Sequence, residues 1–282
     1  MKPFTTLIDA RELARNLHDP RWRVYDCRHD LANVLHGRGA FGRGHIPGAR
    51  FLHLDDDLSG VKSGDNGRHP LPAPHAFAAH MAAHGFEDGV QVVAYDDAGG
   101  AFAARLWWML RWLGHERVAV LDGGLPAWKR AGGVLATGSP GPTTGHVACR
   151  ADHRQVVETT EVLTHLDDPR RLLVDARAPE RFTGESETLD PVAGRIPGAV
   201  NRFYQDNLDD FQCFRPAAEL RDEFVQLLGD RAPGEVIHTC GSGVTACHNL
   251  LAMEIAGLPG SRLYAGSWSA WCSDPARPVA RA

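Results

Sequence analysis

Short hydrophobic runs alternate with longer amphipathic stretches along this chain. Runs typical of buried strands occur at 23–26, 90–95, 172–175 and 236–237, and several are rich in β-branched residues. Helical patterns follow them, and the one at 245–257 ends at a glycine. Strands that alternate with helices are typical of a parallel sheet covered on both faces. The pattern therefore predicts an α/β fold.

This pattern occurs twice in the chain. Three landmarks recur in the same order in each half: an aspartate that ends a buried run, an Ile-Pro-Gly-Ala turn and a closing Ala-Trp pair. They lie at Asp26 and Asp175, at Ile46 and Ile196, and at Trp128 and Trp271. The nearly constant spacing indicates two copies of one domain, because the repeats of a solenoid are much shorter.

We expect the first domain to span 1–136 and the second to span 146–282. The length of 282 residues suits two domains of ordinary size. A stretch rich in Pro, Gly and Ser at 137–145 falls between the two copies, and its composition predicts a linker.

Composition excludes several classes of protein. The content of 43% hydrophobic and 23% charged residues is typical of a soluble globular protein. The net charge of −5 gives no reason to expect a nucleic acid or an anionic membrane as a partner. The sequence has no apolar run near the roughly 20 residues that span a bilayer, and its N-terminus lacks the apolar segment of a signal peptide.

Cysteine and histidine usage points in the same direction. The six cysteines show no paired spacing, which favours reduced thiols in a cytoplasmic protein. The fifteen histidines appear scattered, without a spacing typical of metal ligands. We therefore predict neither a metal nor a cofactor.

Cys240 is the strongest candidate for a chemical role. It follows the predicted strand at 236–237 and precedes Gly241-Ser242-Gly243 and a helix, so it lies at the sheet edge where α/β proteins bind ligands. Glycines allow a loop to turn its backbone N–H groups inward, and a helix N-terminus favours negative charge. These features favour a nucleophilic thiolate over a buried structural cysteine. Cys247, inside the helix, is predicted to be a core residue.

The hexapeptide Cys-Gly-Ser-Gly-Val-Thr at 240–245 and the motif Gly-Ser-Trp-Ser-Ala-Trp at 266–271 resemble the active-site loop and closing motif of two-domain sulfurtransferases. These enzymes form the rhodanese superfamily, and the loop is of the 3-mercaptopyruvate type. The resemblance covers nearly the whole chain and implies two tandem rhodanese-like domains. It implies transfer of a sulfane sulfur from 3-mercaptopyruvate, through a Cys240 persulfide, to a thioredoxin-like protein, another thiol or cyanide.

The resemblance also implies a set of donor-binding residues. Arg181 matches the arginine that these enzymes use to bind the carboxylate or sulfonate of the donor, a task that suits a guanidinium. The loop residues that we expect around the donor are Gly241, Gly243, Val244 and Thr245. Mercaptopyruvate enzymes usually carry a second arginine nine positions after the first, where this chain has Asp190. Arg195, in a position that is usually histidine, either supplies the missing charge or is simply exposed.

A proton relay is implied as well. Segments around Asp55 and His69 resemble those that supply an aspartate and a histidine to the loop of the family. Carried over, Ser242 would exchange a proton with the substrate, His69 would act as its base and Asp55 would orient the imidazole, as in serine proteases.

The first copy serves as an internal control. With the closing Ala-Trp pairs aligned, Asp97 falls opposite Cys240. Because a carboxylate cannot carry a sulfane sulfur, we expect the first domain to be catalytically silent and the active site to belong to the second.

Other functions were weighed against sulfur transfer. A cysteine phosphatase would need an arginine six positions after the cysteine to bind a phosphate, but that residue is Ala246. A cysteine hydrolase using Cys240 and His69, and a non-catalytic sulfur-binding module, remain alternatives. Within sulfur transfer, thiosulfate is the alternative donor. Thiosulfate enzymes of this family place Arg and Lys after the cysteine, whereas neutral Gly-Ser-Gly favours a mercaptan that carries a carboxylate.

Overall fold

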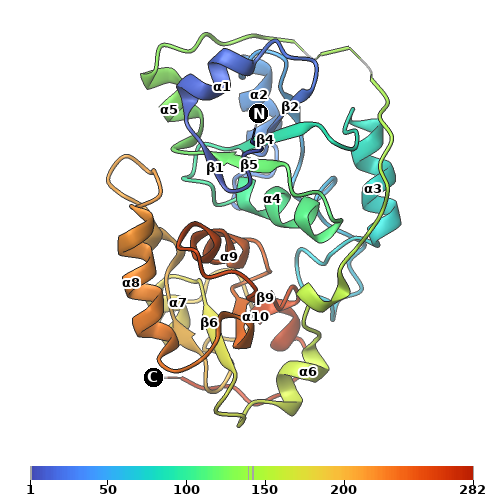
Figure 1. Cartoon of the computed structure of the whole chain (residues 1–282). Helices are drawn as coiled ribbons and strands as arrows, with labels where there is room; N and C mark the ends of the chain where they lie inside the picture. Colours follow the sequence, from blue (N-terminus) through green and yellow to red (C-terminus); the bar gives the residue numbers. More distant parts are fainter. Residues whose placement is uncertain (1, 139, 142, 282) are drawn as a thin grey trace. The chain divides into compact units, whose positions relative to one another are not determined.

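The computed structural model describes residues 2–138, 140, 141 and 143–281 (Figure 1). Of the predicted linker 137–145, Ser139 and Pro142 lie outside the described residues. The chain forms two compact units. Unit 1 comprises the residues up to Ser59 together with Pro72–Asp152 and Leu208–Phe214, and unit 2 comprises Gly60–Leu71, His153–Asn207 and the residues from Arg215 onward. Each unit therefore takes one segment from the other half of the sequence.

Unit 1 is built on a parallel sheet with the strand order β1-β5-β4-β2-β3. Its strands are β1 (Leu7–Ile8), β2 (Trp22–Asp26), β3 (Arg50–Phe51), β4 (Gln91–Tyr95) and β5 (Val118–Leu121). Its helices are α1 (Ala10–Asn16), α2 (His36–Arg43), α3 (Pro74–Ala83), α4 (Ala103–Trp112) and α5 (Gly124–Arg130). Asp9 caps α1, and its carboxylate accepts a hydrogen bond of 2.8 Å from the N–H of Glu12.

Helices cover both faces of this sheet. Leu13 of α1, Phe41 of α2 and Trp128 of α5 pack in one core with strand residues such as Val93. The buried helix α4 packs against β4 and β5, and Figure 1 shows it on the face opposite α1 and α5. Because both faces are covered, β4 is buried along its whole length, from Gln91 to Tyr95.

Unit 2 repeats this plan with a parallel sheet in the order β7-β6-β8-β9. Its strands are β6 (Leu172–Asp175), β7 (Val200–Asn201), β8 (Val236–Thr239) and β9 (Arg262–Leu263). Its α-helices are α6 (Thr159–Thr164), α7 (Pro179–Thr183), α8 (Ala217–Leu228), α9 (Ala246–Ile255) and α10 (Ser267–Trp271). Three short 3₁₀ turns complete the described part of it: η1 (His153–Gln155), η2 (Tyr204–Asn207) and η3 (Pro233–Glu235).

The sheet of unit 2 is also covered on both faces. Val162 of α6, Trp268 and Trp271 of α10, and Ile237 of β8 belong to one core. On the other face α9 packs against β8, and α8 packs on α9. The predicted α/β fold, with two parallel sheets flanked by helices, is therefore confirmed. None of the described helices is long and apolar enough to cross a membrane.

Candidate active site

Cys240 directly follows β8, the central strand of unit 2 that pairs with β6 and β9. It begins the loop 240–245, and α9 starts at the next residue, Ala246. The N–H of Cys240 donates to Oγ of Ser267 over 3.1 Å, and its carbonyl accepts from the N–H of Trp268 over 3.0 Å. These two hydrogen bonds fix the backbone of Cys240. The residue is buried, with only 2% of its surface exposed.

Gly243 explains why the loop requires a glycine. Its φ is +76°, in the left-handed region that residues with a Cβ rarely adopt. A Cβ at this position would also overlap the carbonyl oxygen of Ala265, which is backbone and cannot rotate away. The loop therefore reaches its shape through both the conformational freedom and the small size of this residue.

We expect Gly243→Ala to destabilise unit 2 and to distort the loop. The left-handed conformation alone costs about 1–2 kcal/mol with a Cβ, and the overlap with Ala265 adds to that cost. Gly198→Ala is the matched control, because Gly198 has φ +77° but its Cβ would find its nearest neighbour at 3.5 Å. Urea denaturation of both variants measures the difference in the free energy of unfolding. Equal losses would show that the contact with Ala265 is unimportant.

The register of the two sheets corrects one sequence alignment. Asp26 pairs with Tyr95 in unit 1, and the equivalent Asp175 pairs with Thr239 in unit 2. The next residue along is Asp96 in the first copy and Cys240 in the second, so Asp96, and not the exposed Asp97, occupies the position of the nucleophile. The alignment shifts because the loop before the helix is one residue longer in the first copy than in the second.

Asp96 shows what this type of loop binds. Its buried carboxylate accepts four backbone N–H bonds of 2.8–2.9 Å, from Ala98, Gly100, Phe102 and Ala103. Burial raises the pKa of this carboxyl, although the four N–H groups favour its charged form. In unit 2, within the described residues, the N–H groups of Ser242, Val244 and Thr245 donate no hydrogen bond to the protein. The loop 240–245 therefore has N–H groups available for an anionic sulfur at Cys240.

Ser242 and His69 lie together, although they are far apart in the sequence. Nδ1 of His69 is 2.8 Å from Oγ of Ser242, and both residues are buried. The segment Gly60–Leu71 is held at this place because the N–H of Arg68 donates to Oγ of Ser269 over 3.0 Å. Asp55 belongs to unit 1, where its Oδ2 lies 3.9 Å from Nε2 of His29.

Arg181, in the middle of α7, is held by two carboxylates. Its Nε and Nη2 donate to Glu187 over 2.9–3.2 Å, and Nη2 also donates to Asp190 over 3.1 Å. Its Nη1 and Nη2 both lie 3.4 Å from the position that a Cβ of Gly241 would take. Arg181 thus reaches the loop beside Cys240, as the resemblance implies.

Asp190 has a partner that sequence reasoning missed. Arg68 donates from Nη1 to Oδ1 of Asp190, and its Nη2 lies 2.9 Å from the Cβ position of Gly241. Arg195 does not fill this role, since its guanidinium stacks on the ring of Phe182 at 4.8 Å. The adjacency of Arg68 to His69 was the available signal, but its pairing with Asp190 depends on the tertiary structure.

A second buried arginine lies behind the loop. Arg177 makes a two-pronged ion pair with Asp175 at the end of β6, and its guanidinium lies over Trp268 at 5.0 Å. Burial opposes its charge, but Asp175, Glu187 and Cys240 outweigh this effect and raise its pKa. Arg177 therefore keeps its positive charge near Cys240.

The other cysteines lack this environment. The six cysteines, all of which the structure describes, are free. Cys247 is buried in α9, and its thiol donates to the carbonyl of Gly243 over 3.4 Å. Burial raises the pKa of Cys27 and Cys213, and it raises that of Cys272 to about 11. These three residues are therefore poor sources of thiolate.

Two groups in unit 1 bring metal-binding atoms together. His29, His53 and Asp55 form one, and Asp57 with His80 and His84 forms the other. His80 and His84 are one helical turn apart, a spacing that the sequence reading overlooked. Asp57 already pairs with Nε2 of His80 over 2.8 Å and accepts the N–H of His53, and His84 bonds the carbonyl of His80. These contacts account for the second group without an ion.

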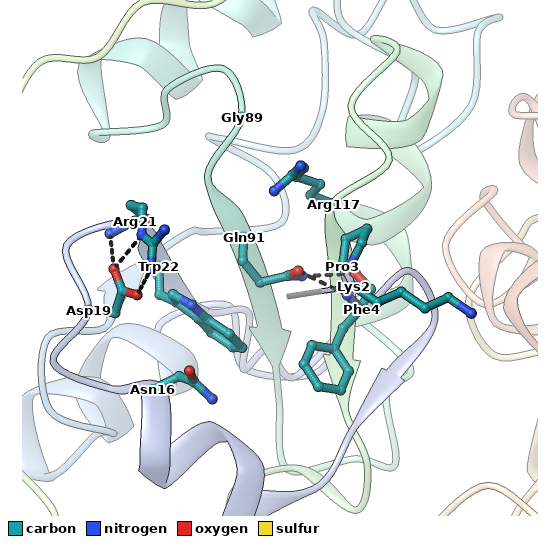
Figure 2. A pocket seen from close by; sticks show the side chains of 10 residues that line it. All are labelled: Lys2, Pro3, Phe4, Asn16, Asp19, Arg21, Trp22, Gly89, Gln91 and Arg117. Carbon is teal, nitrogen blue, oxygen red and sulfur yellow. Dashed lines mark hydrogen bonds and ion pairs between the residues drawn. The ribbon is translucent and has the colours of Figure 1, made fainter.

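A pocket in unit 1 lies at the edge of the sheet where β2 and β4 begin, which is opposite the edge where these strands end. Figure 2 shows the side chains of Trp22, Gln91 and Arg117 around it. The amide of Gln91 is occupied, since it accepts from the N–H of Phe4 over 3.0 Å and donates to the carbonyl of Phe4 over 2.9 Å. The residues that line this pocket include neither a cysteine nor a serine, and the pocket lies in the unit that lacks Cys240.

Comparison with known proteins places these features in context. Residues 9–131 and 158–274 each match the model of the rhodanese-like domain. A "probable 3-mercaptopyruvate sulfurtransferase" of Pseudomonas aeruginosa is 47% identical over 97% of this chain and 97% of the relative. A "putative thiosulfate sulfurtransferase SseB" of Mycobacterium tuberculosis is 38% identical over 98% of this chain and 96% of the relative. The crystal structure of SseA from Escherichia coli, titled as a 3-mercaptopyruvate sulfotransferase, superposes with a TM-score of 0.81 at 32% identity, covering 94% of this chain and all (100%) of that one.

Proposed function

Since this chain belongs to the rhodanese family, we propose that it is a sulfurtransferase that moves a sulfane sulfur from 3-mercaptopyruvate to a thiol or to cyanide through a persulfide on Cys240. The observation that carries the proposal is the loop 240–245. It places Cys240 between backbone N–H groups and the start of α9, with Arg181 at Gly241 and the Ser242–His69 pair within the same loop region.

The first half-reaction can be written with atoms and electrons balanced. The thiolate of Cys240 attacks the sulfur of the donor, and the new S–S bond forms as the C–S bond breaks. The electron pair of the C–S bond goes to the carbon and gives the enolate of pyruvate, which takes up a proton. The thiol of the donor loses its proton during the transfer, and the enolate takes up one proton. The net products are therefore the deprotonated Cys240 persulfide and pyruvate. The N–H groups of the loop stabilise the negative charge on the outer sulfur.

The proton in this step needs a group that both accepts and donates. Ser242 and His69 suit that task, because a hydroxyl at 2.8 Å from an imidazole passes a proton in either direction. His69 takes the proton from the donor thiol by way of Ser242 and returns it to the enolate by the same route. In this proposal Asp55 has the orienting role on the basis of the family resemblance.

In the second half-reaction an acceptor thiolate attacks the outer sulfur of the persulfide. The S–S bond of the persulfide breaks, the acceptor becomes a persulfide, and Cys240 returns to its thiolate form. The acceptor that we propose is a small thiol or a thioredoxin-like protein, and cyanide would accept the sulfur as thiocyanate. A cytoplasmic location is part of this proposal, because both a free Cys240 and a thiol acceptor require reducing conditions.

Thiosulfate is the second candidate donor. The name of the relative from Mycobacterium tuberculosis favours it. Against it, the loop after Cys240 is Gly-Ser-Gly and supplies no side-chain cation for a dianion. Thiosulfate also transfers sulfur without any proton, which would leave the Ser242–His69 pair without a task.

Steady-state kinetics with both donors tests the proposal. We expect a higher kcat/KM for 3-mercaptopyruvate than for thiosulfate, with one pyruvate released for each sulfur that reaches the acceptor. Cyanide serves as a common acceptor, so that the two donors are compared on the same second half-reaction. A higher kcat/KM for thiosulfate would contradict the choice of donor while leaving the persulfide mechanism in place.

A further inference from the structure

Two buried histidines of unit 1 lie next to each other at the carboxyl edge of its sheet. His29 follows β2 and His53 follows β3, and these neighbouring parallel strands end in register, with Asp26 opposite Phe51. The two imidazole rings meet edge to face with 5.2 Å between their centroids, and the residues are only 5% and 6% exposed. Parallel α/β sheets bind ligands at this edge. The fold therefore brings together two imidazoles that are far apart in the sequence.

Asp55 adds a third possible metal ligand to this pair. One ring nitrogen of His29, one of His53 and one carboxylate oxygen of Asp55 all lie within 4.8 Å of one another. Ligand atoms at about 2.1 Å from a tetrahedral zinc ion are about 3.4 Å apart, so each of the three would need to move by no more than about 1 Å. Small rotations of the side chains cover this distance. Two imidazoles and one carboxylate leave the fourth position of the ion to water.

The imidazole of His29 has polar atoms that the protein does not satisfy. Its Nδ1 is buried and has no hydrogen-bond partner among the described residues. Its Nε2 lies 3.9 Å from Oδ2 of Asp55, which is too far for a hydrogen bond. Buried polar groups are nearly always hydrogen-bonded, so this histidine requires an explanation. A neutral imidazole whose lone pair is not used by an N–H group of the protein is available to a metal ion.

His53 is held in a way that is common among metal-binding histidines. Its Nε2 lies 2.8 Å from the carbonyl oxygen of Val34, so this nitrogen donates a proton to the carbonyl and the lone pair lies on Nδ1. The N–H of Asp56 donates to Nδ1 over a long distance of 3.3 Å, a contact that an ion would replace. A backbone carbonyl that fixes the tautomer of the ring is the usual outer partner of a metal-binding histidine.

We propose that His29, His53 and Asp55 form a binding site for one divalent metal ion of the zinc class. Imidazole donors suit Zn²⁺, Co²⁺ and Ni²⁺, whereas Mg²⁺ prefers oxygen ligands. The inference goes beyond the proposed function and does not depend on it. An ion bound to one oxygen of Asp55 leaves the other oxygen for the orienting role in the relay. The expectation of a protein without a metal rested on the histidine spacing in the sequence, which does not reveal ligands from two neighbouring strands.

The second group of possible ligands in unit 1 provides a comparison. Its members already contact one another: Nε2 of His80 pairs with Oδ1 of Asp57 over 2.8 Å, and Nδ1 of His84 bonds the carbonyl of His80 over 3.0 Å. An ion would have to break these contacts before it could bind there. We therefore expect the first group to bind an ion in preference to the second.

Titration calorimetry with Zn²⁺ on the full-length protein tests the proposal. The parent protein carries Cys240→Ser, which removes the thiolate of the loop as a competing ligand. We expect one Zn²⁺ to bind per chain, and we expect no binding of Mg²⁺. His29→Gln in this parent should raise the dissociation constant at least about a hundredfold, because the loss of an outer partner alone costs about 10- to 100-fold. His80→Gln is the matched control and should leave the constant unchanged.

Cobalt identifies the type of ligand by spectroscopy. Co²⁺ bound by two imidazoles and a carboxylate should show visible d–d absorption without the charge-transfer band that a thiolate ligand produces. This spectrum should disappear in His29→Gln and persist in His80→Gln. A charge-transfer band would mean that a cysteine supplies a ligand, and the proposed site would then be wrong.

The calorimetry contains further results that would overturn the inference. These are no saturable Zn²⁺ binding to the folded parent, equal constants in His29→Gln and the parent, or binding that is lost in His80→Gln but kept in His29→Gln. Circular dichroism shows whether each variant folds. Should His29→Gln fail to fold, Asp55→Asn replaces it, because this side chain is 23% exposed and asparagine has the same shape. Its dissociation constant should rise at least about tenfold, and an unchanged constant would contradict the proposal.

Discussion

Cys240→Ser is expected to abolish sulfur transfer from both 3-mercaptopyruvate and thiosulfate while the protein still folds. A serine hydroxyl does not form the persulfide at which the two half-reactions meet, and loss of a nucleophile typically lowers turnover by ~10³ to 10⁶-fold. The substitution is nearly isosteric. The bonds that hold this position come from its backbone, to Ser267 and Trp268, and serine keeps both of them.

Mass spectrometry gives the direct measurement. Wild-type protein incubated with donor and without acceptor should gain the mass of one sulfur atom, and peptide mapping should place it on Cys240. Cys247→Ser is the matched control, since Cys247 is another buried cysteine at the start of α9 and a serine hydroxyl also donates to the carbonyl of Gly243. This control should form the persulfide normally. A sulfur found on Cys247 or Cys272 would overturn the assignment of the nucleophile.

Much of the fold and the position of Cys240 were accessible from the sequence. The position of Cys240 follows from the local sequence alone. In a parallel α/β sheet, a residue between the end of a strand and the start of the next helix lies at the carboxyl edge of the sheet. The proximity of Ser242 and His69 came from the family resemblance, and the distance of 2.8 Å agrees with it. Their separation of 173 positions offers no local signal from which it could have been derived.

The features that the sequence did not predict are pairings across long separations and a small shift in register. The pairing of Arg68 with Asp190 spans 122 positions, and it arises because the segment Gly60–Leu71 packs with unit 2. The sequence alone indicates only that Asp190 stands where related enzymes usually have an arginine. The placement of Asp97 failed for a different reason. The closing Ala-Trp pair sets the alignment of the helices, whereas strand pairing sets the alignment of Asp96 with Cys240.

Ser242→Ala is expected to separate the two donors. With 3-mercaptopyruvate, kcat should fall about 10²- to 10⁴-fold, the usual contribution of a general acid–base group, because the net reaction moves a proton from the thiol to the carbon of pyruvate. With thiosulfate, whose transfer yields sulfite and needs no proton, kcat should change less than about threefold. The measurement is steady-state turnover of one preparation with each donor and cyanide as acceptor, so that thiosulfate serves as the control for folding.

His69→Gln extends this test to the partner of Ser242. Its amide keeps a polar contact with the hydroxyl but takes up no proton, so it should reproduce the donor-selective loss of Ser242→Ala. The double variant should be no slower than either single variant, because the two residues move the same proton. Equal losses with both donors would mean that Ser242 only shapes the loop 240–245. Donor choice would then depend on other groups around this loop, such as the guanidinium of Arg181 beside Gly241.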